Sequence, residues 1–282
     1  MTKLGVFVVP DAGDPELTLG QIVAADRAGL DLVGVQDHPY QRRFFDTWTL
    51  LAYVAARTER ITLLTDVINL PLRQPAVLAK AAASLDVLSG GRVELGLGAG
   101  AFWDGVEAMG GPRRTPGESV EALEEAMQIM RSFLDTEQSV GHEGKHYHAV
   151  GAKPGPAPLH RVGLWVGAYG PRMLRLTGRL ADGWLPSMGS NYMAEAEVAE
   201  RQAAIEEAAK RAGRNPSEIV RAVNAGLDDP HELLDPERLV RISTELGFEA
   251  VLATVPADDP IDFIRRLGEE AAPRARELEG SS

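Results

Sequence analysis

The segment from Arg60 to Gly100 constrains the fold more than any other part of the chain. It predicts a strand at 61–67, a helix from Pro75 to the Gly90-Gly91 pair, and a second strand at 93–97. Proline suits the first turn of a helix, and glycine tolerates the left-handed conformation that helix ends often need. A helix that joins two strands this closely requires a right-handed parallel crossover, so the segment is a βαβ unit.

The same alternation runs along the rest of the chain. Predicted strands cover 4–9, 32–35, 61–67, 93–97, 162–166, 182–185, 219–224 and 250–254. Predicted helices cover 17–28, 47–56, 75–89, 118–134, 172–179, 194–212, 236–246 and 261–272. Eight strand–helix pairs without a break in composition favour a (β/α)8 barrel of the TIM type over an open sheet. We expect residues 1–282 to form a single barrel domain.

One segment interrupts the alternation. Residues of about 137–160 follow the fourth helix and are rich in glycine, proline and histidine. They are too many for a structureless connection. We interpret them as an insertion that covers one mouth of the barrel. The last residues, RARELEGSS, predict a frayed helix and a tail.

Composition narrows the possible partners. The formal net charge of -12 argues against a nucleic acid or an anionic membrane as the main partner. The absence of cysteine excludes disulfides, thiolate zinc sites and cysteine nucleophiles. No apolar run is long enough to span a membrane, and the first residues turn acidic too early for a signal peptide. We therefore expect a cytoplasmic protein that acts on a small-molecule substrate.

Candidate functional residues end the predicted strands, which is where barrels of this class carry their chemistry. Asp37 and His38 end the second strand, and histidine can donate or relay a proton near neutral pH. The alternative is a histidine that Asp37 holds for structural reasons. Gly98 and Gly100 end the fourth strand and leave room for a flat ring or a phosphate, unless they serve only barrel closure.

The turn at Gly167–Arg172 joins the fifth strand to a helix. The first N–H groups of a helix lack partners and carry partial positive charge, so they favour a phosphate. Arg172, Arg175 and Arg179 add positive charge to an otherwise acidic chain. An ordinary turn with solvated arginines is the alternative interpretation.

Two short patterns are rejected. Residues 96–101 match the dinucleotide fingerprint G-x-G-x-x-A, but the segment after them is broken by glycines and a proline where a well-formed helix is required. Residues 142–146 match the zinc-protease pattern H-E-x-x-H, which requires a helix. The flanking glycines favour a hairpin or loop, and we predict no metal site.

Longer segments resemble the bacterial luciferase-like superfamily of flavin- and deazaflavin-dependent oxidoreductases. They are ARTERITLLTDVINLPLRQPAVLAKAAASLDVLSGGRVELGLGAG, WVGAYGPRMLRLTGRLADGW, and ALEEAMQIMRSFL with GKHY, together with Asp37-His38-Pro39. The resemblance covers about residues 1–225. It implies a TIM-type barrel with reduced FMN or the deazaflavin F420 at its C-terminal mouth.

The resemblance also implies roles for individual residues. In F420 members the third strand ends in a bulge with a non-prolyl cis peptide behind the middle ring, and here that bond is Asp66–Val67. Asp37 and His38 match the pair near the redox face, where the histidine assists proton movement at the substrate. Asn69, Gly98, Ala99 and Gly100 match positions along the cofactor and its tail, and Gly167, Ala168, Tyr169, Gly170, Pro171, Arg172 and Met173 match the phosphate-binding turn.

Two positions depart from the family pattern. Asp66 is an acid where many relatives carry a small residue, and a carboxylate there would repel an anionic reduced ring unless protonated or turned away. Ala101 replaces the acidic residue of the F420-dependent sugar-phosphate dehydrogenases. Phe102, Trp103 and Tyr169 suggest an aromatic-lined pocket or ordinary packing.

The Asp-His-Pro sequence resembles the F420 branch of the family, which implies an F420-dependent oxidoreductase that transfers a hydride to or from a small organic substrate. A reduced-FMN monooxygenase and a flavin-binding protein without turnover are the alternatives. A separate cofactor reductase and a homodimer stay open as partners.

Overall fold

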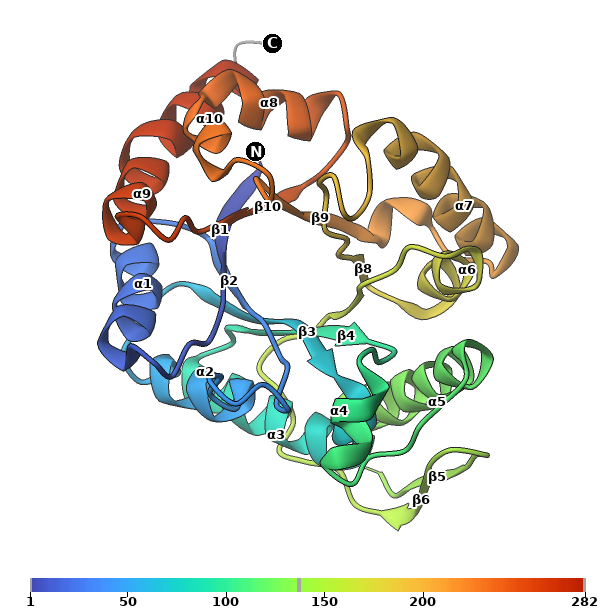
Figure 1. Cartoon of the computed structure of the whole chain (residues 1–282). Helices are drawn as coiled ribbons and strands as arrows, with labels where there is room; N and C mark the ends of the chain where they lie inside the picture. The colour runs from blue at the N-terminus through green and yellow to red at the C-terminus, as the bar shows by residue number, and fades with distance from the viewer. Residues whose placement is uncertain (1, 136–137, 281–282) are drawn as a thin grey trace.

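The computed structural model describes residues 2–135 and 138–280, in which eight parallel strands close into a barrel (Figure 1). Neighbouring strands follow the order β1-β10-β9-β8-β7-β4-β3-β2. The barrel strands are β1 Lys3–Val8, β2 Leu32–Val35, β3 Thr62–Asn69, β4 Val93–Gly98, β7 Leu164–Val166, β8 Gly183–Trp184, β9 Val220–Ala225 and β10 Ala250–Thr254. The predicted (β/α)8 architecture is confirmed.

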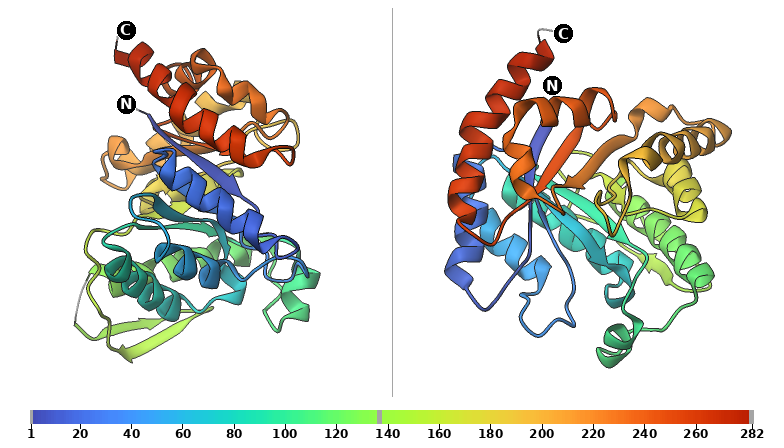
Figure 2. Two further views of the ribbon diagram at one scale, coloured as in Figure 1. Left: turned by 90° about the vertical axis from the view of Figure 1, so that its left-hand side faces the viewer. Right: turned by 45° about the horizontal axis from the view of Figure 1, so that its top comes forward.

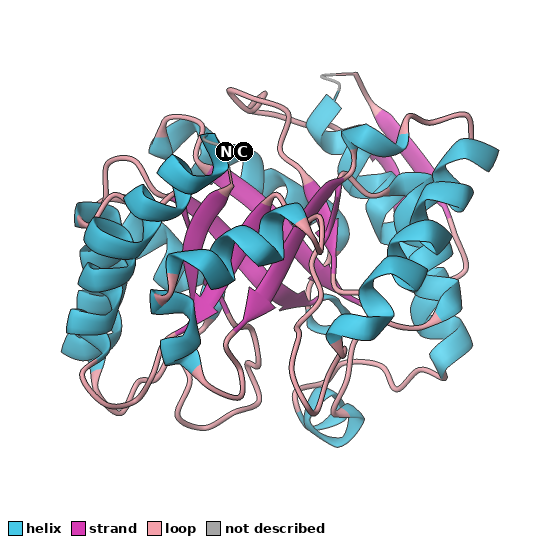
Figure 3. Ribbon diagram, turned by 90° about the horizontal axis from the view of Figure 1, so that it is seen from above, coloured by secondary structure: helices cyan, strands magenta, loops and turns pink. Residues whose placement is uncertain are grey.

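Helices surround the strands, as Figure 3 shows from above. They are α1 Pro15–Arg27, α2 Thr47–Ala55, α3 Pro75–Ser89, α4 Trp103–Ala108, α5 Pro116–Asp135, α6 Pro171–Leu180, α7 Val198–Arg211, α8 Pro236–Thr244, α9 Pro260–Arg266 and α10 Ala272–Gly280. The helical face predicted from Leu78, Ala82 and Leu85 is buried against the barrel. Gly90 ends α3 in the left-handed conformation, with φ 77°.

The inside of the barrel is a small packed cluster separate from the larger core under the helices. Alternate residues of each strand point inward, so β3 contributes Leu64, and β10 contributes Ala250 and Leu252. Trp165 of β7 fills the space beside them. The barrel is therefore a filled core, and ligand chemistry is left to the loops at its ends.

The predicted insertion forms a two-stranded antiparallel hairpin, β5 Val140–Glu143 and β6 His148–Ala152. The expectation that it covers a mouth of the barrel is wrong, because the hairpin lies outside the ring of helices against α5 (Figure 1). Glu125 of α5 fixes it there by accepting the backbone N–H groups of Lys145, His146 and Tyr147. Residues 142–146 lie in this hairpin, as expected. Residue 137 of the predicted insertion is outside the described residues.

The two ends of the chain meet. The α9 helix lies beside α1, and α10 packs against α8 (Figure 1 and Figure 2). Glu279 accepts the backbone N–H of Thr2 at 3.0 Å, and Arg276 pairs with Asp31 at 2.8 Å. The helix predicted from RARELEGSS is confirmed as far as Gly280, and these contacts tie α10 to the start of the chain. Ser281 and Ser282 lie outside the described residues.

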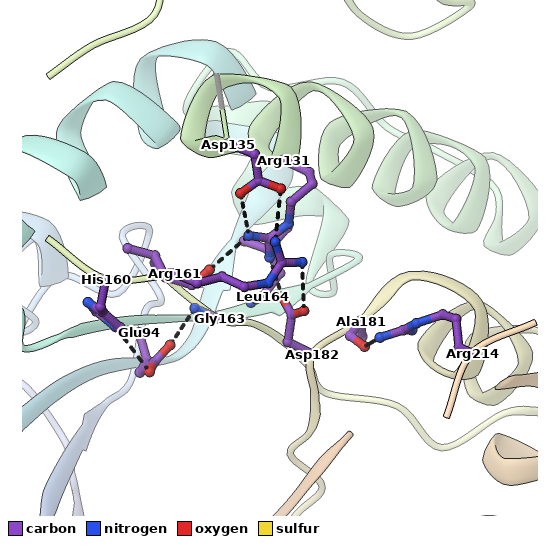
Figure 4. Close-up of polar contacts among 11 residues, drawn as sticks. Glu94, Arg131, Asp135, His160, Arg161, Gly163, Leu164, Ala181, Asp182 and Arg214 are labelled. Atoms are coloured by element: carbon purple, nitrogen blue, oxygen red, sulfur yellow. Dashed lines mark hydrogen bonds and ion pairs between the residues drawn. The ribbon is translucent and has the colours of Figure 1, made fainter. Parts of the chain in front are cut away.

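A polar network ties β7 and β8 together at their N-terminal ends (Figure 4). Asp182 accepts from the backbone N–H of Leu164 at 2.9 Å and pairs with Arg131 and Arg161. Arg161 also reaches Asp135 at 2.9 Å. Because this network lies on the face opposite the carboxyl ends of the strands, we assign it to stability.

In the described part of the chain, no helix is long and apolar enough to cross a membrane.

Candidate functional site

The end of β3 is the most irregular point of the barrel rim. The Asp66–Val67 peptide is cis without a proline, and the pairing of β3 with β4 shifts register between Thr65 and Ile68. The bulge and the cis bond expected from the resemblance are both confirmed. At this point Asp66 faces the barrel interior, and Val67 lies against the glycines that end β4 and follow β7.

Val67 is surrounded by glycines. A Cβ added at Gly98 would lie 2.8 Å from a methyl carbon of Val67, and one added at Gly167 would lie 3.4 Å away. At Gly100 an added Cβ would meet Pro71 and Trp103 at 2.6 and 2.7 Å. The space that these glycines leave is therefore filled by the chain's own side chains. This close packing within the chain favours the alternative in which Gly98 and Gly100 serve barrel closure.

Asp37 does not hold His38. Its fully buried carboxylate accepts the backbone N–H of Asn69 at 2.9 Å and pairs with Arg73 at 3.0 Å. Arg73 also pairs with Asp46, at 2.6 Å. Asp37 therefore positions the segment after β3, and the direct Asp37–His38 contact considered from the sequence is not made.

His38 has aromatic neighbours instead. Its Nδ1 lies 2.6 Å from the hydroxyl of Tyr40, and its ring meets that of Phe102 edge-on at 5.5 Å. Burial lowers the pKa of His38, and the negative charge of Asp37 opposes that shift. Burial raises the pKa of Tyr40. The pair is therefore a neutral imidazole beside a protonated phenol near pH 7.

Sequence reasoning missed Tyr40, although it lies two residues from His38. Phe102 was noted only as an aromatic residue near a strand end. It has φ 54°, a left-handed conformation that is unusual for a bulky residue, and it is 64% exposed. An exposed aromatic ring held in this conformation beside His38 can cover an apolar ligand at the rim.

Asp66 is buried inside the barrel end. Its Oδ1 accepts from the side-chain amide of Asn224 on β9 at 3.0 Å, and a Cβ added at Gly34 would lie 2.5 Å from its Oδ2. Burial raises the pKa of Asp66 to about 7, although the hydrogen bond from Asn224 opposes part of that rise. The side chain is thus turned inward and readily protonated, and these are the two conditions under which an acid was expected to be tolerated here. Sequence reasoning did not find Asn224.

The turn at 167–173 is fixed by contacts with β8 and α7. The Ala168 carbonyl accepts from the indole N–H of Trp184 at 2.9 Å, and the Tyr169 hydroxyl accepts from the backbone N–H of Ser187 at 2.8 Å. Arg201 donates to the Tyr169 carbonyl at 2.8 Å.

The α6 helix then begins at Pro171 after Gly170, and no side chain of the described residues caps its N-terminus. Arg172 is exposed beside it. Met173 packs partly on the core, as Ala99 does at the end of β4. The first N–H groups of α6 therefore stay available to an anion.

The rim contains buried polar atoms without partners. In the described part of the chain, Asp66 Oδ2, Asn69 Oδ1 and Asn224 Oδ1 make no hydrogen bond. A buried polar atom without a partner costs about 1–3 kcal/mol, so these atoms favour a ligand with hydrogen-bonding edges. A planar ring carrying amide groups, as flavins and deazaflavins do, meets that requirement.

Comparison with known proteins agrees with this geometry. A profile described as luciferase-like monooxygenase matches residues 2–227. The chain is 34% identical to the F420-dependent glucose-6-phosphate dehydrogenase of Nocardia farcinica, over 84% of this chain and 72% of that protein. It is 32% identical to the 5,10-methylenetetrahydromethanopterin reductase of Methanolobus tindarius, over 96% of this chain and 76% of that protein.

Among solved structures, an F420-dependent secondary alcohol dehydrogenase in complex with an F420-acetone adduct superposes with a TM-score of 0.83 at 20% identity, covering 98% of this chain and 99% of that one. This similarity concerns the fold. The profile match covers most of the chain, and the chain therefore belongs to the luciferase-like monooxygenase family.

Proposed function

We propose that this protein is an F420-dependent oxidoreductase that transfers a hydride between the deazaflavin and a small organic substrate. The observation that carries the proposal is the bulge at the end of β3, where the pairing with β4 shifts register between Thr65 and Ile68. It occurs where F420 members of the family are expected to back the middle ring of the cofactor. The names of the curated relatives, which include F420-dependent dehydrogenases, support the same choice.

In this proposal each part of the rim has a role. Val67 packs behind the ring, and Asn69 offers a hydrogen-bonding oxygen at its edge. Gly98, Ala99 and Gly100 border the cofactor, while the segment 167–173 holds its phosphate through the N–H groups at the start of α6. The inward side chain of Asp66 keeps negative charge away from a ring that becomes anionic on reduction.

His38 is the proposed acid or base for the substrate. The bound cofactor supplies the hydride chemistry, and the protein supplies position and proton transfer. Because Tyr40 keeps its proton, its O–H can donate to Nδ1 of His38, which leaves the ring proton on Nε2. Nε2 then donates its proton to a substrate carbonyl oxygen while the Tyr40 hydroxyl passes its proton to Nδ1, and solvent reprotonates Tyr40. When an alcohol is oxidised, the same transfers run in reverse, so that Nε2 takes the alcohol proton and Nδ1 returns a proton to Tyr40. Asp37 holds the segment after β3 in place, through the backbone N–H of Asn69 and the side chain of Arg73.

Cofactor titration tests the proposal directly. Fluorescence titration of the purified protein with F420 and with FMN should show tight binding of F420 and weak or no binding of FMN. Loss of the visible absorbance of oxidised F420 on addition of small alcohols would then identify the substrate class.

Tight binding of FMN alone would refute the F420 assignment and favour a reduced-FMN monooxygenase supplied by a separate reductase. Binding of either cofactor without turnover of any substrate would favour the flavin-binding alternative. The homodimer and the cytoplasmic location stay predictions.

A further inference from the structure

A pocket lies beside the segment that follows β3. It has a volume of about 490 Å³ and separates the turn of the β5–β6 hairpin from the segments that follow β3 and α4. Its polar lining is formed by Arg73, Gln74, Arg113, Arg114, Glu118, Lys145, His146 and Tyr147. The inserted hairpin therefore forms one wall of a pocket that the barrel alone would lack.

The lining is basic although the protein is acidic. Four permanently charged cations border the pocket against a single carboxylate, that of Glu118, in a chain of net charge -12. Glu118 is engaged by the backbone N–H and hydroxyl of Thr115, at 2.9 and 2.8 Å. A local excess of positive charge in an acidic protein attracts anions selectively.

Three of the cations already have carboxylate partners. Arg73 pairs with two aspartates, Arg113 pairs with Asp104 and Glu107, and Lys145 pairs with Glu121 at 3.0 Å. The Arg73 guanidinium is only partly used, because its Nε is buried and donates to no acceptor among the described residues. A buried N–H without an acceptor favours an oxygen ligand beside it.

Arg114 is the cation without a carboxylate partner. It makes no ion pair within residues 2–135 and 138–280, and its guanidinium carbon lies 5.2 Å from the centre of the Tyr147 ring. Its Nη1 donates to the Tyr147 hydroxyl at 3.2 Å. Tyr147 is buried and its backbone N–H is held by Glu125, so the position of Arg114 is set before any ligand arrives. Preorganised guanidinium groups are well suited to two-oxygen contacts with phosphate or carboxylate.

We propose that this pocket binds the oxyanion group of a small molecule, a phosphate or a carboxylate, with Arg114 as the central ligand and Arg73 and Lys145 beside it. The proposal does not depend on the proposed function. It does bear on the rim, because Arg73 also holds Asp37, which in turn holds the backbone of Asn69.

Calorimetric titration of the whole protein with inorganic phosphate, and separately with glutarate, tests the proposal and distinguishes the two anions. We expect saturable binding of one of them at a single site. Arg114→Gln should weaken that binding about tenfold or more, and Arg114→Lys should weaken it less because the charge is kept.

Arg57→Gln is the matched control. Arg57 also lies over a tyrosine ring, 5.1 Å from the centre of Tyr53, and forms no ion pair within the described residues, but it does not line this pocket. Binding that is absent, that is unchanged in Arg114→Gln, or that is lost in Arg57→Gln would overturn the proposal. Loss in Arg172→Gln alone would also overturn it, by placing the anion at the start of α6.

A measurement on the unmutated protein covers the case in which Arg114→Gln does not fold. Phenylglyoxal modifies accessible arginines, and mass spectrometry reports the rate at each one. The bound anion should slow modification of Arg114 and leave that of Arg57 unchanged. Equal rates with and without the anion would overturn the proposal.

Discussion

Replacing Asp66 with asparagine should stabilise the protein, and increasingly so as the pH rises. The pKa of this buried carboxyl is raised from 3.8 to about 7, chiefly by burial. The folded protein therefore holds the proton more tightly than the unfolded chain does. The stability that Asp66 contributes is complete below pH 3.8 and is lost as the pH rises to about 7.

The size of the effect follows from the same shift. Each tenfold change in proton affinity is about 1.4 kcal/mol, so ionisation of Asp66 costs the folded state about 4 kcal/mol by pH 8. Asparagine has nearly the same shape, cannot ionise, and can still accept from Asn224. The stability advantage of Asp66→Asn over the wild type should therefore grow by about 3 kcal/mol between pH 5 and pH 8.

Urea unfolding of both proteins at pH 5 and pH 8 measures this difference. Asp258→Asn is the control, because Asp258 is exposed and we expect its replacement to have the same small effect at both pH values. An Asp66→Asn variant that is less stable than the wild type at pH 8, or whose advantage is the same at both pH values, would contradict the reasoning.

Three further variants test separate parts of the structure. His38→Gln should lower kcat about 100-fold or more with little change in F420 affinity, and equal turnover would remove it as the acid or base. Gly34→Ala should destabilise by about 1–3 kcal/mol in urea unfolding, because its Cβ would lie 2.5 Å from Asp66 Oδ2; an unchanged midpoint would contradict that packing. Asp182→Asn should cost about 2 kcal/mol in the same assay, since it removes the negative charge that half-buried Arg131 shares with Arg161, and F420 affinity should stay constant.

The barrel could be predicted because it depends on local patterns. Apolar periodicity and the proline and glycine signals between Arg60 and Gly100 define a βαβ unit within one short segment, and repetition of the unit fixes the architecture. The site depends on contacts between distant segments. Asp66 and Asn224 are 158 residues apart, and no local pattern links an acid on one strand to an amide on another.

Neighbours in sequence were also misleading. Asp37 and His38 are adjacent, yet successive side chains near a strand end point in different directions, and Asp37 turns to Arg73 instead. The hairpin could be predicted as an insertion from its glycine and proline content, but its place depends on Glu125, a residue of the preceding helix. Whether the hairpin covers a mouth of the barrel or lies on its flank depends on its packing in three dimensions.

The pairing of β1 with β10 means that the first and last strands of the barrel complete the ring together. A chain emerging from the ribosome cannot satisfy the outer hydrogen-bonding groups of β1 until residues 250–254 have been made. Until then the growing sheet exposes two unprotected edges, one on β1 and one on the strand most recently added, and such edges favour aggregation. Release of the nascent chain before Ala250 should therefore yield an insoluble product, whatever the quality of the catalytic site already built.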